Sequence, residues 1–129
     1  MTEIQNSKQK QMNPNGKKYD LEERTFEFAR DVRRFVKKLT KTLANVEDGR
    51  QLIRSSGSIG ANYIEANESL SKKDFLMRIK ISRKEAKESR FWLRLLDVQV
   101  ELEKEHNYLL NESVEITNIF GAILRKTEG

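Results

Sequence analysis

Residues 71–100 read SKKDFLMRIK ISRKEAKESR FWLRLLDVQV and contain the longest regular pattern of the chain. Apolar or small residues recur in it at alternating steps of four and three, the heptad spacing of a helix that packs along one seam. Ser71 has the chemistry of an N-cap, with Asp74 three residues later. We therefore predict a long helix whose seam has small residues in its middle. The seam consists of Phe75, Ile79, Ser82, Ala86, Ser89, Leu93, Leu96 and Val100.

The preceding segment, from about Val46 to Leu70, is predicted to be a second helix, although it contains the run SSGSIGA at residues 55–61. By propensity this run favours a loop, because each glycine costs about 1 kcal/mol against alanine in a helix interior. Helical periodicity continues on both sides, and small residues on successive turns allow a neighbouring backbone to approach closely. We expect tight packing here, with a real break as the alternative. One face consists of Leu52, Ser56, Ile59, Tyr63, Ala66 and Leu70.

Two further helices complete the pattern. Asp20 and Glu23 have the spacing of a capping box, and the helix that they open is predicted to run to about Leu43. A break is expected around residues 104–107, and the last helix is predicted over residues 111–126. Short connections elsewhere favour an all-α, antiparallel, up-down-up-down four-helix bundle.

The composition agrees with a single helical domain. The chain has 129 residues, of which 36% are hydrophobic and 35% charged, with one Pro and six Gly. A β-sandwich or barrel needs more turn residues than this, and the length allows only one ordinary core. We assign the bundle to residues 20–129. Residues 1–19 are polar and are predicted to be a disordered basic tail.

Several classes of protein are excluded or disfavoured by what the sequence lacks. It has no cysteine, which excludes disulfide scaffolds and thiolate metal sites. The N-terminal residues have no apolar core of a secretion signal, and no stretch approaches 18 apolar residues. A cytoplasmic protein without membrane association is expected.

The sequence also favours a protein that is not an enzyme. The one histidine, His106, is expected in a polar loop, and no Glu-x-x-His pair suggests a di-iron site. The serines near residue 56 have no apparent histidine partner, and no glycine-rich phosphate loop is present. We predict no catalytic residue, no metal site and no cofactor.

The net charge of +5 is unevenly distributed, since residues 71–100 carry +5 and residues 101–129 carry −3. A row of cations follows the heptad steps of the seam, one residue further along, and therefore flanks the core. Its unbroken part covers roughly 21 Å of helix at the standard rise. It consists of Lys80, Arg83, Lys87, Arg90 and Arg94.

Three interpretations of this row remain open. It could contact the phosphates of a nucleic acid, which is the leading single interpretation. Its long side chains could instead lie over the apolar edge and keep their charges in water. It could also pair with acidic residues of the last helix or of another subunit. Under the first interpretation, cations of the first helix would add phosphate contacts, namely Arg30, Arg34, Lys37 and Lys41.

Residues 91–96 are apolar nearly all round the helix, which indicates burial on more sides than one small bundle offers. Phe91, Trp92 and Leu95 lie outside the seam and are predicted to contact another copy of the protein. Trp92 as a platform for base stacking is the alternative.

Three segments resemble a known family. They are Arg54-Ser55-x-x-Ser58-Ile59-x-x-Asn62-x-x-Glu65, Ser71-Lys72-Lys73-Asp74-Phe75 and Glu85-Ala86-x-Glu88-Ser89-x-x-Trp92-Leu93. The likeness is to the bacterial four-helix bundle proteins named for intervening sequences of 23S rRNA genes, and it covers about residues 20–126. Asn67 stands where that family commonly has glycine.

The segment from Arg90 to Arg94 is also similar to the accessory variability determinant of diversity-generating retroelements. That resemblance implies a homopentameric ring that binds RNA or DNA and has a reverse transcriptase as partner. It implies no reaction. The leading hypothesis is a non-catalytic nucleic-acid-binding or accessory protein, and the alternative is a scaffold that binds an acidic protein.

Overall fold

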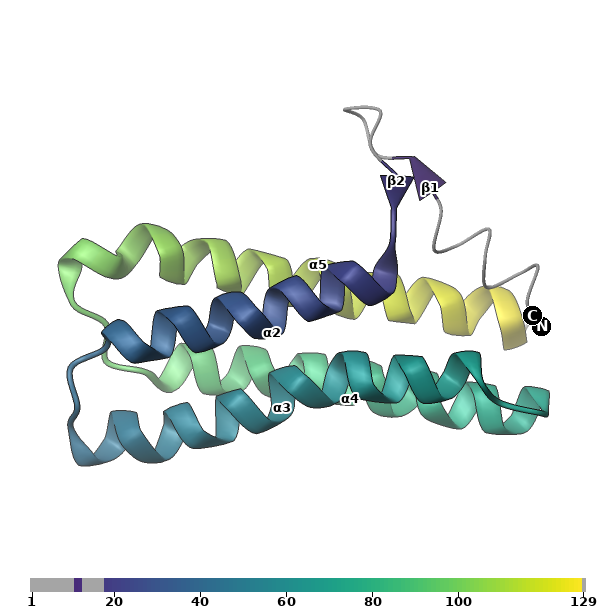
Figure 1. The fold of residues 1–129 in the computed structure, drawn as a ribbon, viewed down its shortest axis with the longest axis horizontal. Coiled ribbons are helices and arrows are strands. Elements are labelled where there is room, and N and C mark those ends of the chain that lie inside the picture. The colour runs from purple at the N-terminus through teal and green to yellow at the C-terminus, as the bar shows by residue number, and fades with distance from the viewer. Residues whose placement is uncertain (1–10, 13–17, 129) are drawn as a thin grey trace.

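The computed structural model describes residues 11–12 and 18–128 and confirms the all-α bundle (Figure 1). Neighbouring helices in the chain run antiparallel, and α2 and α4 each pack against both α3 and α5. The prediction of a disordered tail falls mostly outside the described residues. The elements are β1 (Gln11–Met12), β2 (Lys18–Tyr19), α2 (Leu21–Lys38), α3 (Leu43–Asn67), α4 (Lys72–Leu95), the 3-10 helix η1 (Val100–Leu102) and α5 (Glu103–Glu128), with β1 and β2 paired antiparallel.

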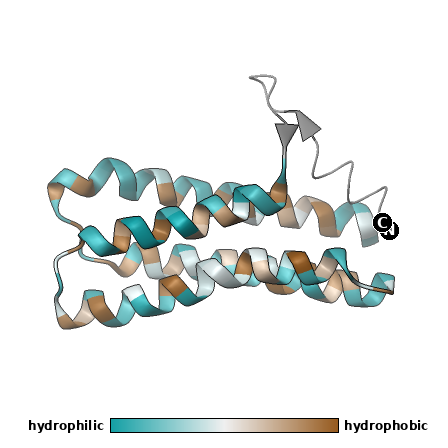
Figure 2. Cartoon of the chain, viewed as in Figure 1, coloured by the Kyte–Doolittle hydropathy of each residue, from teal (hydrophilic) through white to brown (hydrophobic). Residues whose placement is uncertain are grey.

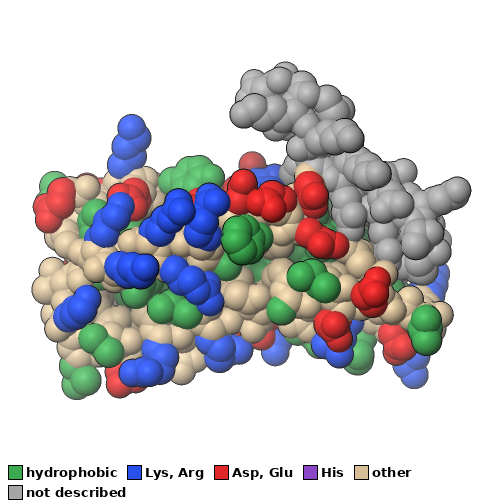
Figure 3. Space-filling view, viewed as in Figure 1, with side chains coloured by type: hydrophobic (Ala, Val, Ile, Leu, Met, Phe, Trp, Pro, Cys, Tyr) green, Lys and Arg blue, Asp and Glu red, His purple; other side chains and the backbone are tan. Residues whose placement is uncertain are grey.

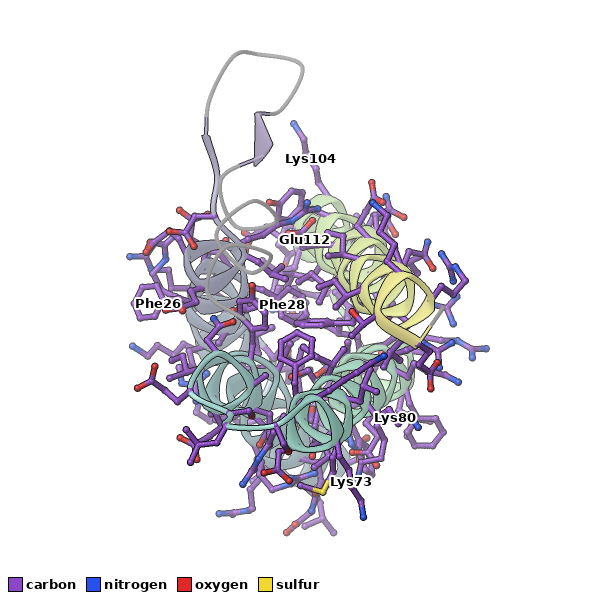
Figure 4. All side chains as sticks on the ribbon, turned by 90° about the vertical axis from the view of Figure 1, so that its right-hand side faces the viewer. Phe26, Phe28, Lys73, Lys80, Lys104 and Glu112 are labelled. Carbon is purple, nitrogen blue, oxygen red and sulfur yellow. The ribbon has the colours of Figure 1, made fainter. Side chains whose placement is uncertain are left out.

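The hydrophobic core lies between the four helices, where each contributes one apolar face. The seam predicted for α4 is buried from Phe75 to Leu93, and Leu96 at its C-cap is also buried. In Figure 4, Phe28 points in among the helices, whereas Phe26 on the same helix points away from them. Two positions predicted to be buried are exposed. Leu70, predicted on the apolar face of the second helix, is 99% exposed beyond the end of α3, and Val100, predicted in the seam, is 77% exposed in η1.

The run of small residues in α3 is continuous helix, as predicted, and it brings α3 close to α4. The hydroxyls of Ser55 and Ser89 hydrogen bond to each other at 2.9 Å, and Ser82 Oγ donates to the backbone oxygen of Ile59 at 3.0 Å. All three serines are fully buried. The middle of α3 is therefore pale in Figure 2, between hydrophobic and hydrophilic. The tight packing expected at residues 55–61 is confirmed, and it is made with the small middle of the α4 seam.

The same run also brings α3 close to α2, on a second side that the sequence did not reveal. A Cβ atom placed on Gly60 would lie 2.8 Å from Thr25 Oγ1. Thr25 is buried and its hydroxyl donates to the backbone oxygen of Leu21 at 2.9 Å, so this side chain cannot turn away freely. Gly60 thus permits contact with α2, while the serines make contact with α4.

The boundary between α2 and α3 lies earlier than predicted. Asp20 caps α2 as expected, but the helix ends at Lys38 rather than near Leu43. Thr42 is the N-cap of α3, and its hydroxyl accepts from the backbone N–H of Asn45 at 3.1 Å. Threonine is a preferred N-cap residue, but the hydrophobic periodicity continued past it and favoured a longer first helix.

The end of α4 is fixed by a contact from the start of α3, which lies at the same end of the bundle. The chain leaves the helix at Leu96, before the predicted end at Val100. Asn45 then holds the next residue, since its Oδ1 accepts from the Asp97 N–H at 2.9 Å and its Nδ2 donates to the Asp97 oxygen at 2.9 Å. Such a pairing, across 52 residues, has no local sequence signal.

The break predicted at residues 104–107 is wrong, because α5 begins at Glu103 and continues through Asn111. His106 lies inside this helix rather than in a loop. Its ring stacks on Phe35 with centroids 5.8 Å apart, and its Nε2 is 2.7 Å from the Leu93 oxygen. A histidine therefore occupies a core-facing position of α5, where the sequence pattern looked polar.

The close contact at Gly60 leads to a stability prediction. Gly60→Ala should lower the free energy of unfolding by up to about 2 kcal/mol, because overpacking costs about 1–3 kcal/mol and helix propensity returns about 1 kcal/mol. Gly60→Leu should cost more. The measurement is urea unfolding followed by circular dichroism.

Gly57→Ala is the matched control. Its added Cβ would lie 3.2 Å from Arg33 Nη2, so the end of this long side chain would have to shift by only a few tenths of an ångström. This variant should be at least as stable as the parent protein. A Gly60→Ala variant that is more stable than the parent would contradict the proposed packing.

Candidate nucleic-acid interface

The cation row of α4 lies at the solvent-exposed side of that helix, next to α5. All five side chains are exposed. Lys80 Nζ lies 3.6 Å from a Glu128 carboxylate oxygen, so one member of the row pairs with the last helix. Within residues 18–128, the other four make no ion pair. They are therefore available to an external anion.

A fifth available cation comes from α5. A Cβ atom on the buried Gly121 would lie 3.5 Å from Arg83 Nε and 3.4 Å from Arg125 Nη1. The two guanidinium groups thus approach each other over a residue without a side chain. Arg125 also makes no ion pair with a described residue. Two like charges held together favour the binding of an anion between them.

A groove of about 420 Å³ lies farther along the same side, between α4 and α5. Arg90 and Arg94 line one wall, and the amide side chains of Asn107 and Asn111 line the other. Guanidinium and amide groups are donors that phosphate and base edges accept. We call this surface the α4/α5 face, and it consists of Arg83, Lys87, Arg90, Arg94, Asn107, Asn111 and Arg125.

The sequence identified only part of this face. Arg125, Asn107 and Asn111 were missed because nothing in the chain places them beside α4. Asn111 is the first residue of the last helix predicted from the sequence, whereas in the structure it is an exposed side chain well within α5. A helix begun at Glu103 would have shown that the two asparagines share one side of α5, four residues apart.

The cations predicted on the first helix lie on another side of the bundle. Arg30, Arg34 and Lys37 line a groove between α2 and α3. Arg34 also lies near Glu105 and Tyr108 of α5, and Lys41 lies in the connection between α2 and α3. Asp31 Oδ1 is 3.3 Å from Arg30 Nε and 3.9 Å from Arg34 Nη1. These side chains form no single surface with the row on α4.

The residues predicted to contact another copy are only partly exposed. Phe91 and Leu95 are each 52% exposed on α4. Trp92 is half-buried and packs against the core, with its ring edge-to-face with Phe91 at 5.0 Å between centroids. Of these three residues, Phe91 and Leu95 supply the exposed apolar surface, and Trp92 packs against Phe91 and the core.

The segments that resemble the known family mostly join α3 to α4. Arg54 Nη2 lies 3.5 Å from Glu85 Oε1 and 3.6 Å from Glu88 Oε2. The next residue along each helix after Arg54 and Glu88 is a serine, and the hydroxyls of these two residues, Ser55 and Ser89, hydrogen bond to each other. These side chains hold two helices together, so their part in the resemblance is structural.

The second half of the same segment makes a further connection. Arg78 Nη1 donates to Asn62 Oδ1 at 2.9 Å, and Arg78 Nη2 lies 4.0 Å from Glu65 Oε1. Asn62 and Glu65 belong to α3, whereas Arg78 belongs to α4. Polar side chains therefore connect the two helices on either side of the small, buried middle.

Neither a metal centre nor a membrane span emerges from the described part of the chain. Among residues 18–128, no three His, Asp or Glu side chains are grouped so as to hold a metal ion. Within that same range, no helix combines the length and apolar character needed to cross a bilayer.

Comparison with known proteins shows a family and a solved structure that this chain resembles. Residues 17–122 match the family described as 23S rRNA-intervening sequence protein. A crystal structure from Bacteroides thetaiotaomicron, of a protein with unknown function from the S23 ribosomal protein family, is 30% identical with a TM-score of 0.68. The match covers 81% of this chain and 95% of that one. No curated protein matches.

The buried Glu85 gives this region a pH dependence. Burial, and then the hydrogen bond and charge of Glu88, raise the pKa of Glu85 above its usual value of 4.5, while Arg54 and Lys84 oppose the rise. A carboxyl group with a raised folded-state pKa stabilises the fold most when protonated, and this contribution is lost as pH rises through that pKa.

Replacing Glu85 with Gln should remove this dependence. The stability of the Glu85→Gln variant, relative to the parent protein, should increase as pH rises from 4.5 towards neutral pH. Urea unfolding at a series of pH values measures the difference. If the difference is the same at every pH, or falls as pH rises, the assignment for Glu85 is wrong.

Proposed function

Because the chain belongs to the 23S rRNA-intervening sequence protein family, we propose that it is a non-catalytic protein that binds nucleic acid through the α4/α5 face. One observation carries the proposal. Four exposed cations follow one another on α4 at steps of three and four residues, and none is in an ion pair with a described residue. A row of this kind matches a chain of phosphates better than it matches a compact anion.

The groove between α4 and α5 adds donors for more than phosphate. Asn107 and Asn111 face Arg90 and Arg94 across it, so a backbone following the row would bring its sugars or bases to the amides. The contacts of the two asparagines contribute little to the affinity. Phosphate neutralisation supplies most of it, and binding should be largely independent of sequence.

Two finer parts of the proposal rest on the resemblance to the accessory variability determinant. One is a pentameric ring, in which Phe91, Trp92 and Leu95 contact a neighbouring copy. The other is a reverse transcriptase as partner in a diversity-generating retroelement. The half-exposed Phe91 and Leu95 support the first, because adjoining aromatic and aliphatic side chains favour burial at an interface.

The nucleic-acid interface is tested by charge reversal. The parent protein should bind mixed-sequence RNA or DNA at about 50 mM salt, with a log–log salt slope of about −0.9 per duplex contact or about −0.7 on single strands. Replacing Arg83, Lys87 and Arg90 together with Glu should abolish binding. Fluorescence anisotropy measures both, and circular dichroism checks that the fold is retained.

A matched control uses the other basic surface. Replacing Arg30, Arg34 and Lys37 with Glu makes the same change in net charge on the opposite side of the bundle. This variant should keep most of the affinity of the parent protein. The proposal fails if the parent shows no binding, or if the two triple variants lose affinity equally.

The ring is tested by the mass of the protein in solution. Light scattering should give a mass near five times 15.1 kDa. Phe91→Asp with Leu95→Asp should reduce it to that of a monomer while helicity is retained, because both side chains are half-exposed. Met77→Asp, at a position 49% exposed on the same helix, should leave the mass unchanged. A monomeric parent protein would rule out the ring.

A further inference from the structure

A second groove, of about 550 Å³, lies between α2 and α3. Its floor consists of small residues from both helices: Ala29, Gly57, Gly60 and Ala61. Gly60 allows α3 to approach Thr25, and because it has no side chain it also leaves space on the solvent side of the two helices. The groove follows from the helix packing and needs no rearrangement to form.

Two large apolar side chains border this floor, one from each helix. Phe26 of α2 is 59% exposed and Ile64 of α3 is 50% exposed. Figure 4 shows Phe26 pointing outward, away from the core that receives Phe28. Apolar side chains on both sides of a small-residue floor favour a partner that buries its own apolar side chains there.

One end of the groove is strongly basic. Arg30, Arg33, Arg34 and Lys37 line it, and Asp31 is the one carboxylate among described residues that pairs with any of them. Figure 3 shows this side of the molecule, with Lys and Arg gathered over one half and Asp and Glu gathered over the other. The excess of positive charge is therefore local to one end.

Arg33 is fixed in place at this end. Its Nη1 donates to the Ala29 oxygen at 3.0 Å and its Nη2 donates to the Ile53 oxygen at 3.4 Å. The guanidinium group thus connects α2 to α3 over Gly57, where a Cβ atom would lie 3.2 Å from Nη2. A cation held by backbone oxygens loses little freedom when an acidic partner binds.

We propose that this groove binds an amphipathic helix of a partner protein, with its apolar face between Phe26 and Ile64 and acidic residues at the end that meets Arg33, Arg34 and Lys37. A strand is disfavoured, because α2 and α3 offer no sheet edge for pairing. From Phe26 to Lys37 the groove covers roughly 16 Å of helix, about three turns of a bound helix.

The chemistry favours protein over nucleic acid at this groove. The hydroxyl of Thr25 donates to the Leu21 oxygen, so it is committed within α2. The floor has no amide side chain, in contrast to the α4/α5 face with its two asparagines. The two grooves thus differ in the partner they fit, and this inference does not depend on the proposed nucleic-acid interface.

The test uses two designed peptides and the full-length protein. Both peptides carry leucines at helical spacing along one face. They differ at one end, where the residues beside the leucines are Glu in the first peptide and Lys in the second. The Glu peptide should bind the parent protein at about 50 mM salt, where charges are only partly screened, and the Lys peptide should bind at least about tenfold more weakly. Isothermal titration calorimetry measures both affinities.

Two variants then place the site. Ala61→Phe fills the groove at an exposed helix position and should weaken the Glu peptide on the order of tenfold or more. Arg34→Glu with Lys37→Glu should do the same, and should improve binding of the Lys peptide. Arg83→Glu with Lys87→Glu, on the opposite side, should leave the affinity of the Glu peptide unchanged.

The proposal is wrong if the Glu peptide does not bind, if both peptides bind equally, or if Ala61→Phe keeps the affinity of the parent. It is also wrong if a mixed-sequence oligonucleotide displaces the Glu peptide and loses affinity through Ala61→Phe, since the groove would then be a nucleic-acid site. Circular dichroism should show unchanged helicity for every variant.

Discussion

The close approach of α3 to two neighbours at once is the constraint on which the rest of the structure depends. On one side, buried serines connect it to α4 through the 2.9 Å contact between Ser55 and Ser89. On the other, Gly60 leaves just enough space for Thr25 of α2. A larger side chain at either place would separate the helices, because packed interiors do not deform gradually. The run that looked least helical in the sequence is thus the centre of the bundle.

This arrangement also determines what the protein shows to its surroundings. Bulky aromatic side chains such as Phe35 and Phe120 fill the core, whereas Phe26 and Phe91 lie at the surface. The cations of α2 and α4 lie on opposite sides of the bundle, because each of these two helices packs against α3 and α5 rather than against the other. One side combines guanidinium groups with amides, and the other combines them with an apolar floor. Both sides are positively charged, but their other side chains suit them to different partners.

Periodicity predicted most of the fold and little of what ends each helix. The seam of α4 is buried as expected from Phe75 to Leu93, because heptad spacing directly reflects one packed face. The chain leaves α4 where Asn45 hydrogen bonds to the backbone of Asp97. The first turns of α5 pack on the core through His106, whose ring stacks on Phe35. Both are contacts between distant parts of the chain, so no local pattern could have shown them.

The candidate site was predictable to a similar degree. Cations at heptad steps had to share one side of α4, and they do. Their surroundings depend on which α5 residues the fold brings next to them. Glu128 forms an ion pair with Lys80, and the guanidinium group of Arg125 lies near that of Arg83 above Gly121. The most direct measurement is a titration of ¹⁵N-labelled protein with a mixed-sequence oligonucleotide. Our account predicts shifts concentrated on the α4/α5 face, with little change around the groove between α2 and α3. Shifts centred on that groove instead would contradict it.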